Sequence, residues 1–142
     1  MQKTGGSVAA FIAGVTPAKR RRDAETMLAI MSEITGRDPE LWGTIIGFGS
    51  CHYLYPTGTQ GDMPVTAFAP RKQASTLYLA PGFTSRTAAL ADLGPHTTSV
   101  SCLYLKDLDL VDHDVLRQII ADSEAQMRSG QGWDGATITL TD

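Results

Sequence analysis

The cysteine and histidine side chains are the candidate transition-metal ligands and nucleophiles of this chain. Neither a C-x-x-C nor an H-x-x-x-H spacing occurs among them, so no common metal-binding motif is present. Cys51 and His52 are adjacent in a predicted strand, and adjacent strand residues point to opposite faces, so both cannot bind one ion without a bulge. The thiols are predicted to be reduced and to behave as small buried hydrophobes. The full set is Cys51, His52, His96, Cys102 and His113.

An acidic stretch runs from Asp107 to Asp114. Counted as a calcium-binding loop, it has Asp112 where the loop needs glycine and Gln118 where it needs glutamate, which excludes that motif. The stretch is better explained as the start of a helix, because carboxylates stabilise a helix N-terminus and Asp112 can cap it. Hard oxygen ligands for iron are the weaker alternative, and the ligands would be Asp107, Asp109, Asp112 and Asp114.

Alternation within two predicted strands places polar aromatic side chains on one face of a sheet. If the leucines face the helices, then Tyr78 points the other way, and so do Tyr104 and Lys106. Because tyrosine offers apolar area and a hydroxyl together, such a face can bind a small ligand, a protein partner or a second copy of the chain. An ordinary half-solvated sheet face explains the same pattern.

Motifs for catalysis are few. The Gly47-Phe48-Gly49 segment lacks the third glycine and the helix of a dinucleotide-binding loop, and strand glycines more often mark a bulge or close packing. No serine nucleophile elbow is present. The one basic run, at 19–22, lacks accompanying aromatic residues and is predicted to be a solvated helix face. We therefore expect a protein that is not an enzyme, with no cofactor.

Hydrophobic spacing predicts the helices and strands that position these side chains. Helices are expected at 7–14, 17–36, 84–93 and 112–130, where capping residues precede apolar positions three or four residues apart. Strands are expected at 45–55, 65–68, 76–79 and 101–105, which are rich in β-branched, aromatic and leucine residues. The order ααβββαβα predicts an α+β fold, in which helices cover mainly one face of an antiparallel sheet of about four strands. The tail at 131–142 is either an edge strand or flexible.

Composition limits the class of protein. The chain has 142 residues, of which 42% are hydrophobic and 19% charged, with a net charge of −3, and this is typical of one folded domain spanning 1–142. Two cysteines cannot form a disulfide framework, and no apolar run approaches the roughly 18 residues of a membrane span. A mildly acidic total disfavours nucleic-acid binding. No cleavable signal peptide is apparent at the N-terminus, so a cytoplasmic protein that does not bind membranes is expected.

Several short motifs, taken in order, are similar to the YdhG-like family of bacterial domains of unknown function. The resemblance runs from about residue 8 to about residue 123, and its motifs are Leu41-Trp42-Gly43, Ile46-Gly47-Phe48-Gly49, His52-Tyr53, Tyr55, Phe68-Ala69-Pro70-Arg71-Lys72, Leu77-Tyr78-Leu79, Leu93-Gly94 with His96, and Ser101-Cys102-Leu103-Tyr104-Leu105-Lys106. It implies a small α+β domain without an established activity. One branch of the family is described as frataxin-like iron chaperones, so the resemblance implies iron handling as an alternative function.

The chain departs from the family pattern before Cys102. Relatives carry lysines between the third helix and the fourth strand, whereas residues 94–102 here contain none. If those lysines hold an anion in relatives, the remaining nearby cations are Arg71, Lys72 and Lys106. We expect a non-enzymatic module that binds a small anionic ligand or a protein partner, with a homodimeric interaction domain as a further alternative. The predicted ligand-binding residues are Trp42, His52, Arg71, Lys72, Tyr78, His96, Tyr104 and Lys106.

Overall fold

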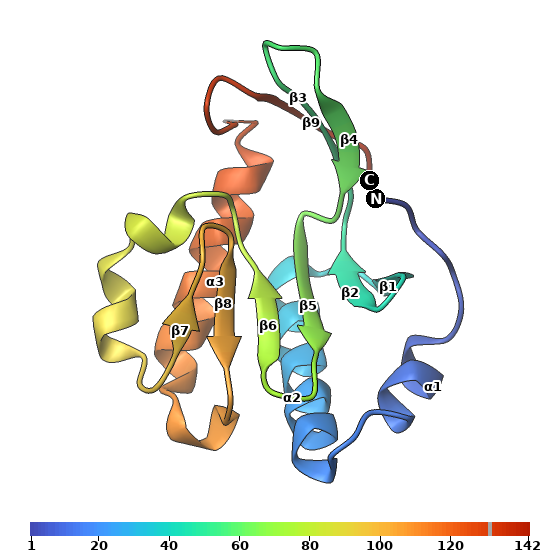
Figure 1. Ribbon diagram of the computed structural model, residues 1–142, viewed down its shortest axis with the longest axis vertical. Coiled ribbons are helices and arrows are strands. Elements are labelled where there is room, and N and C mark those ends of the chain that lie inside the picture. Colours follow the sequence, from blue (N-terminus) through green and yellow to red (C-terminus); the bar gives the residue numbers. More distant parts are fainter. Residues whose placement is uncertain (131) are drawn as a thin grey trace.

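The computed structural model describes residues 1–130 and 132–142, and three α-helices lie in this part of the chain (Figure 1). They are α1 (Val8–Ala13), α2 (Ala18–Thr35) and α3 (His113–Arg128). The predicted N-caps Ser7 and Asp112 and the predicted C-terminal glycines Gly14 and Gly36 are confirmed, whereas α3 ends at Arg128, with Ser129 rather than Gly130 as its C-cap. Ser7 accepts a hydrogen bond from the N–H of Ala10, Gly36 ends α2 with a φ of 65°, and Asp112 accepts from the N–H groups of Asp114 and Val115.

The strands of the described residues form two antiparallel sheets. The larger sheet has six strands in the order β1-β2-β5-β6-β8-β7, and the smaller has three in the order β4-β3-β9. The larger sheet contains β1 (Pro39–Trp42), β2 (Ile45–Phe48), β5 (Thr66–Pro70), β6 (Ser75–Tyr78), β8 (Cys102–Leu105) and β7 (Thr97–Thr98). The smaller sheet contains β4 (Gln60–Met63), β3 (Cys51–Leu54) and β9 (Thr137–Leu140). Gln131, the first residue of the tail considered above, lies outside the described residues.

The predicted sheet of about four strands in the order ααβββαβα is wrong, because residues 1–130 and 132–142 contain nine strands in two sheets. The segment predicted as one strand at 45–55 is divided at Gly49, whose φ of 75° redirects the chain so that β2 and β3 enter different sheets. β4 lies where a loop was expected, since its pairing with β3 outweighs its weak strand propensity.

The helix predicted at 84–93 is also wrong. Two short 3₁₀ helices take its place, η1 (Phe83–Ser85) and η2 (Ala88–Asp92). Thr87 separates them, because its side chain accepts a hydrogen bond from the N–H of Ala89 and so begins a new turn. A third such helix, η3 (Leu108–Leu110), follows β8 and leads into α3.

The core lies between the larger sheet and the two long helices, which stand behind the sheet in Figure 1. One continuous row of paired residues crosses four strands, with Ile46 opposite Phe68, Phe68 opposite Leu77, and Leu77 opposite Leu103. All four side chains are fully buried. None of the helices in the described part of the chain is long and apolar enough to cross a bilayer.

The basic run at the start of α2 connects this helix, through ion pairs and hydrogen bonds, to the end of β8 and the segment that follows it. Lys19 forms ion pairs with Asp23 at 2.8 Å, with Asp107 at 2.7 Å and with Asp109 at 3.0 Å. Arg20 is buried and donates hydrogen bonds to the carbonyl oxygens of residues 105 and 106. These two cations are therefore structural, although the sequence predicted a solvated face.

A second ionic network joins α3 to the strand that follows it in the chain. Arg128 donates to Glu124 Oε1 at 2.6 Å and to Asp142 Oδ2 at 2.7 Å. Glu124 is buried and also accepts a hydrogen bond from Thr66, and Arg37 donates to Asp142 Oδ2 at 2.9 Å. The network therefore ties α3, β5 and the residues after β9 together.

Candidate functional site

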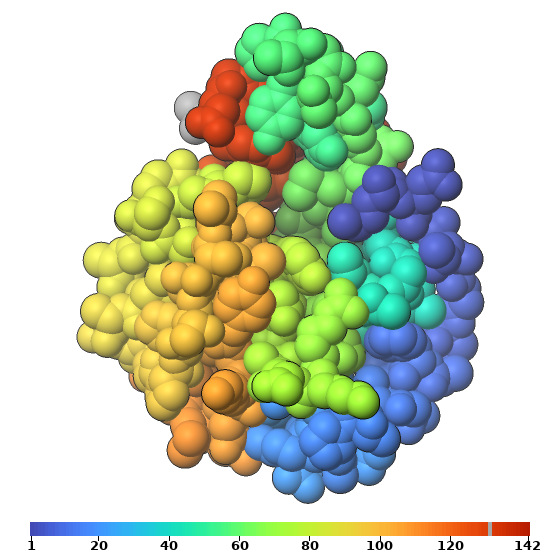
Figure 2. Space-filling model, viewed as in Figure 1, coloured from blue at the N-terminus to red at the C-terminus, as the bar shows by residue number. Residues whose placement is uncertain are grey.

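The face of the larger sheet that points away from α2 and α3 carries the predicted polar aromatic side chains. Leu77, Leu103 and Leu105 are fully buried against the helices, which confirms the predicted alternation. Tyr78 and Tyr104, which occupy alternate positions in β6 and β8, are only partly buried. No helix lies over β6 and β8 in the view of Figure 2, so this face is accessible.

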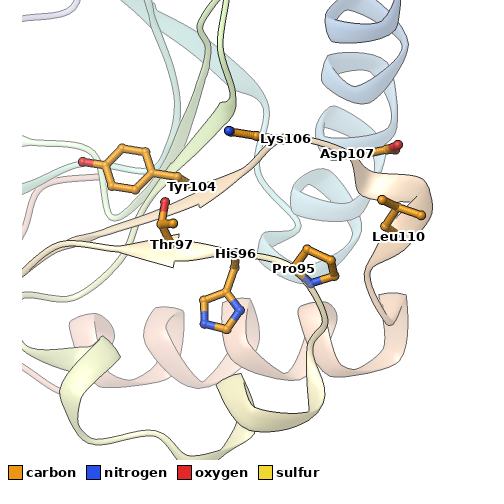
Figure 3. Close-up of a pocket in the computed structure, with 7 residues that line it drawn as sticks. All are labelled: Pro95, His96, Thr97, Tyr104, Lys106, Asp107 and Leu110. Carbon is orange, nitrogen blue, oxygen red and sulfur yellow. The ribbon is translucent and has the colours of Figure 1, made fainter.

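A cavity of about 310 Å³ opens at one end of this face, where β7 and β8 meet η3 (Figure 3). Thr97 and Tyr104 are direct partners in the β7–β8 pairing, which places their side chains on the same face. Lys106 and Asp107 follow β8, and Leu110 ends η3. The lining residues are Pro95, His96, Thr97, Tyr104, Lys106, Asp107 and Leu110.

Among the residues that the structure describes, the lining of the cavity contains one ammonium group, that of Lys106, and one carboxylate, that of Asp107. Its only carboxylate within the described residues, Asp107, is paired with Lys19 Nζ at 2.7 Å. The hydrogen bond from Lys19, together with one from the backbone N–H of Asp109, holds the pKa of Asp107 below its usual range. The Lys106 ammonium is exposed and makes no hydrogen bond or ion pair with any side chain that the structure describes. Lys106 is therefore available to an anion.

Further polar groups and apolar surface complete the cavity. His96 Nδ1 donates to the carbonyl oxygen of Gly94 at 2.7 Å. The Tyr104 hydroxyl lies 3.2 Å from Ser99 Oγ. Leu110, with 62% of its surface exposed, supplies an apolar wall that few side chains cover. The arrangement suits a small molecule that has one anionic group and one apolar part.

Three other predicted residues belong to the β5–β6 hairpin outside this cavity. Arg71 donates to Thr44 Oγ1 at 2.7 Å and to the Tyr78 hydroxyl at 3.4 Å. Lys72 lies in the exposed turn of the hairpin, beside Arg71. The structure therefore brings Arg71 and Tyr78 together, but it places neither of them nor Lys72 in the lining of the cavity.

Trp42 and His52 lie elsewhere in the molecule. Trp42 is only 4% exposed and packs over Gly47, where an added Cβ would lie 2.6 Å from the indole Nε1. His52 lies on β3 in the smaller sheet, where its ring nitrogens contact Asp62 Oδ1 at 2.8 Å and Gln60 Oε1 at 2.9 Å. The hydrogen bond to Asp62, followed by the one to Gln60, raises the pKa of His52.

The four aspartates of the iron alternative do not converge. Asp107 and Asp109 contact Lys19, and Asp112 accepts hydrogen bonds from the first turn of α3, to which Asp114 belongs. Across 1–130 and 132–142, no group of three or more His, Cys, Asp or Glu side chains is arranged to hold a metal ion. Burial raises the pKa of the Cys51 thiol to about 11.

Sequence reasoning missed three residues of the cavity, namely Pro95, Thr97 and Leu110. Thr97 belongs to β7, a strand of only two residues that is too short to show alternation, and Pro95 lies just before it. Leu110 lies in the acidic stretch beside Leu108 and Val111, which are both buried, so the sequence gives no signal that Leu110 alone is exposed.

No protein family, curated protein or solved structure matches this chain. The similarity to the YdhG-like family therefore stays a prediction.

Proposed function

We propose that this protein is a binding module for a small organic anion, which occupies the cavity between β7, β8 and η3. The observation that carries the proposal is the Lys106 ammonium, which lines the cavity without a side-chain partner among the described residues, while the neighbouring Asp107 carboxylate pairs with Lys19 instead. A ligand's carboxylate or phosphate would pair with Lys106, and its apolar part would pack against Tyr104 and Leu110. A volume of about 310 Å³ restricts the ligand to a small molecule.

Thermal denaturation against a panel of small carboxylates and phosphates tests the proposal. A ligand at a hundredfold excess over its Kd stabilises the folded state by about 2.7 kcal/mol, which raises the Tm of a domain of this size by roughly 8 °C. Lys106→Met removes the cation and is expected to abolish the shift for every anion that stabilises the wild type.

Arg22→Met provides the matched control. Arg22 is an exposed cation on α2 whose side chain has no partner among the residues that the structure describes. It should leave the ligand-induced shift intact. The proposal fails if no anion stabilises the wild type, or if Lys106→Met and Arg22→Met respond alike. A second copy on this face would instead appear in light scattering of the purified protein as a larger mass without any ligand-induced shift.

A further inference from the structure

A second and larger cavity lies where the smaller sheet meets the loops that flank β6 and β8. Its volume is about 680 Å³, and it shares no lining residue with the cavity described above. Tyr55 and Trp133 line it from the side of the smaller sheet, which stands at the top of Figure 1, and Arg86 and Val100 line it from the loops. Val100 is 74% exposed, so the cavity opens onto apolar as well as polar surface.

The aromatic wall of this cavity belongs to a cluster of three rings. Tyr53, Tyr55 and Trp133 form a three-ring cluster with centroid separations of 5.8, 6.1 and 6.2 Å. The indole N–H of Trp133 donates to the hydroxyl oxygen of Tyr55. Because that bond uses a lone pair of the hydroxyl, the Tyr55 O–H remains a donor that can point to a ligand.

A tight turn holds Trp133 in the wall and Asp134 at the rim. The N–H of Ala136 donates to the carbonyl oxygen of Trp133 at 2.8 Å, and the two central residues have φ values of 49° at Asp134 and 78° at Gly135. Positive φ at both central positions defines a type I′ turn, for which Asp-Gly is a favoured pair. The Asp134 side chain is exposed beside the cavity that it lines.

Two opposite charges face this cavity without neutralising each other. Arg86 donates to Gln126 Oε1 of α3 at 2.7 Å, which positions the guanidinium and leaves its other N–H groups available. The Asp134 carboxylate makes no ion pair or hydrogen bond with any group in 1–130 or 132–142. One cavity therefore presents an anion-binding group, a cation-binding group and an aromatic wall.

We propose that this cavity binds an aromatic amino acid in its zwitterionic form. Arg86 pairs with the carboxylate, Asp134 pairs with the ammonium group, and the aromatic ring packs on Tyr55 and Trp133. The site is independent of the small-anion cavity, because the residues that line the two are different.

Tryptophan fluorescence tests this assignment directly. The chain has two tryptophans, so Trp42→Phe leaves Trp133 as the sole reporter. In that background, L-phenylalanine is expected to change the emission of Trp133 saturably. Arg86→Met and Asp134→Asn should each weaken its binding by about tenfold or more, since each removes a charge-assisted contact. Asparagine tolerates positive φ, so the second variant preserves the turn.

Ligands that lack one charge identify the two contacts separately. Phenethylamine has no carboxylate, so its affinity should be unchanged by Arg86→Met and reduced by Asp134→Asn, and 3-phenylpropanoate should show the reverse. Lys106→Met should not change phenylalanine binding, so failure of this site and failure of the small-anion site are distinguishable. A Trp133 emission that does not respond saturably to millimolar phenylalanine overturns the proposal, as does equal binding by both charge variants and the parent.

Discussion

Replacing Arg128 by methionine removes the cation that joins α3 to Asp142. The variant loses hydrogen bonds to Glu124 Oε1 at 2.6 Å, to Asp142 Oδ2 at 2.7 Å and to Asp142 Oδ1 at 3.3 Å. It also leaves the Glu124 carboxylate, which is 8% exposed, with the Thr66 hydroxyl as its one partner among the described residues. The cost is therefore mainly that of a buried charge without its counter-ion.

The magnitude follows from burial and from the partners that remain. Breaking one side of a buried ion pair costs about 3–5 kcal/mol. The Arg128 side chain is 22% exposed and Asp142 keeps Arg37, so the lower end of that range applies. We expect the free energy of unfolding to fall by about 3 kcal/mol, which is a large part of the roughly 5–15 kcal/mol typical of a domain.

Urea denaturation measures this loss, and Arg117→Met on the same helix is the control. Arg117 pairs with Glu33 at 2.7 Å, but the two side chains are 40% and 65% exposed, so the pair contributes at most about 1 kcal/mol. With a urea dependence of about 1.5 kcal/mol per molar, the midpoint should fall by about 2 M in Arg128→Met. Equal midpoints in the two variants would refute the reasoning.

The same variant has an expected pH signature. Arg128 holds the pKa of Asp142 below its usual value, so this carboxylate contributes stability above the unfolded pKa of about 3.9. That contribution is lost as the pH falls through the lower folded pKa. Stability in Arg128→Met should therefore depend less on pH at the acid end, although Arg37 preserves a part of the effect.

Three further outcomes are expected. Gly47→Ala should destabilise the fold by about 1–3 kcal/mol in urea denaturation, because its Cβ would lie 2.6 Å from the indole Nε1 of Trp42. The pKa of His52 is raised in the folded state, so its stabilising contribution is complete below the unfolded pKa of about 6.5 and is lost as the pH rises through the folded pKa. The urea midpoint of the wild type should therefore fall across that pH range. The midpoint of His52→Gln should show no such step. Asp112→Ala removes the acceptor for two N–H groups of α3 and should lower the free energy of unfolding by about 1 kcal/mol, whereas Asp109→Ala should cost less in the same assay, because Lys19 keeps two other carboxylates.

Local signals predicted the parts of the fold that depend on local interactions. Ser7 and Asp112 begin helices because their side chains accept hydrogen bonds from the first-turn N–H groups, and Gly36 ends a helix because glycine readily adopts positive φ. These effects depend only on neighbouring residues. The short strands β4 and β7 depend on pairing with a partner strand, so the residues of each carry too little information.

The candidate site was predictable to the same extent. Alternation placed Tyr104 and Lys106 on the accessible face, because the side-chain period of a strand is fixed. The neutralisation of Asp107 by Lys19 was not predictable, since α2 and the segment after β8 are distant in the sequence and meet only in the folded chain. The separation of His52 from Tyr104 was not predicted either, because the chain changes direction at Gly49 and β3 joins another sheet than β8.

The outer strands of the larger sheet bear on aggregation. β7 offers only two residues, Thr97 and Thr98, to an incoming strand, which is too short a ladder for another chain to extend. At the opposite edge, Thr4 already binds backbone groups along the outer side of β1. Its N–H donates to the carbonyl oxygen of Leu41 at 2.9 Å, and its hydroxyl accepts from the N–H of Gly43 at 3.0 Å. Neither edge strand therefore offers a long row of free backbone groups to another chain. The larger sheet can leave one broad face accessible to ligands without promoting fibril growth at its edges.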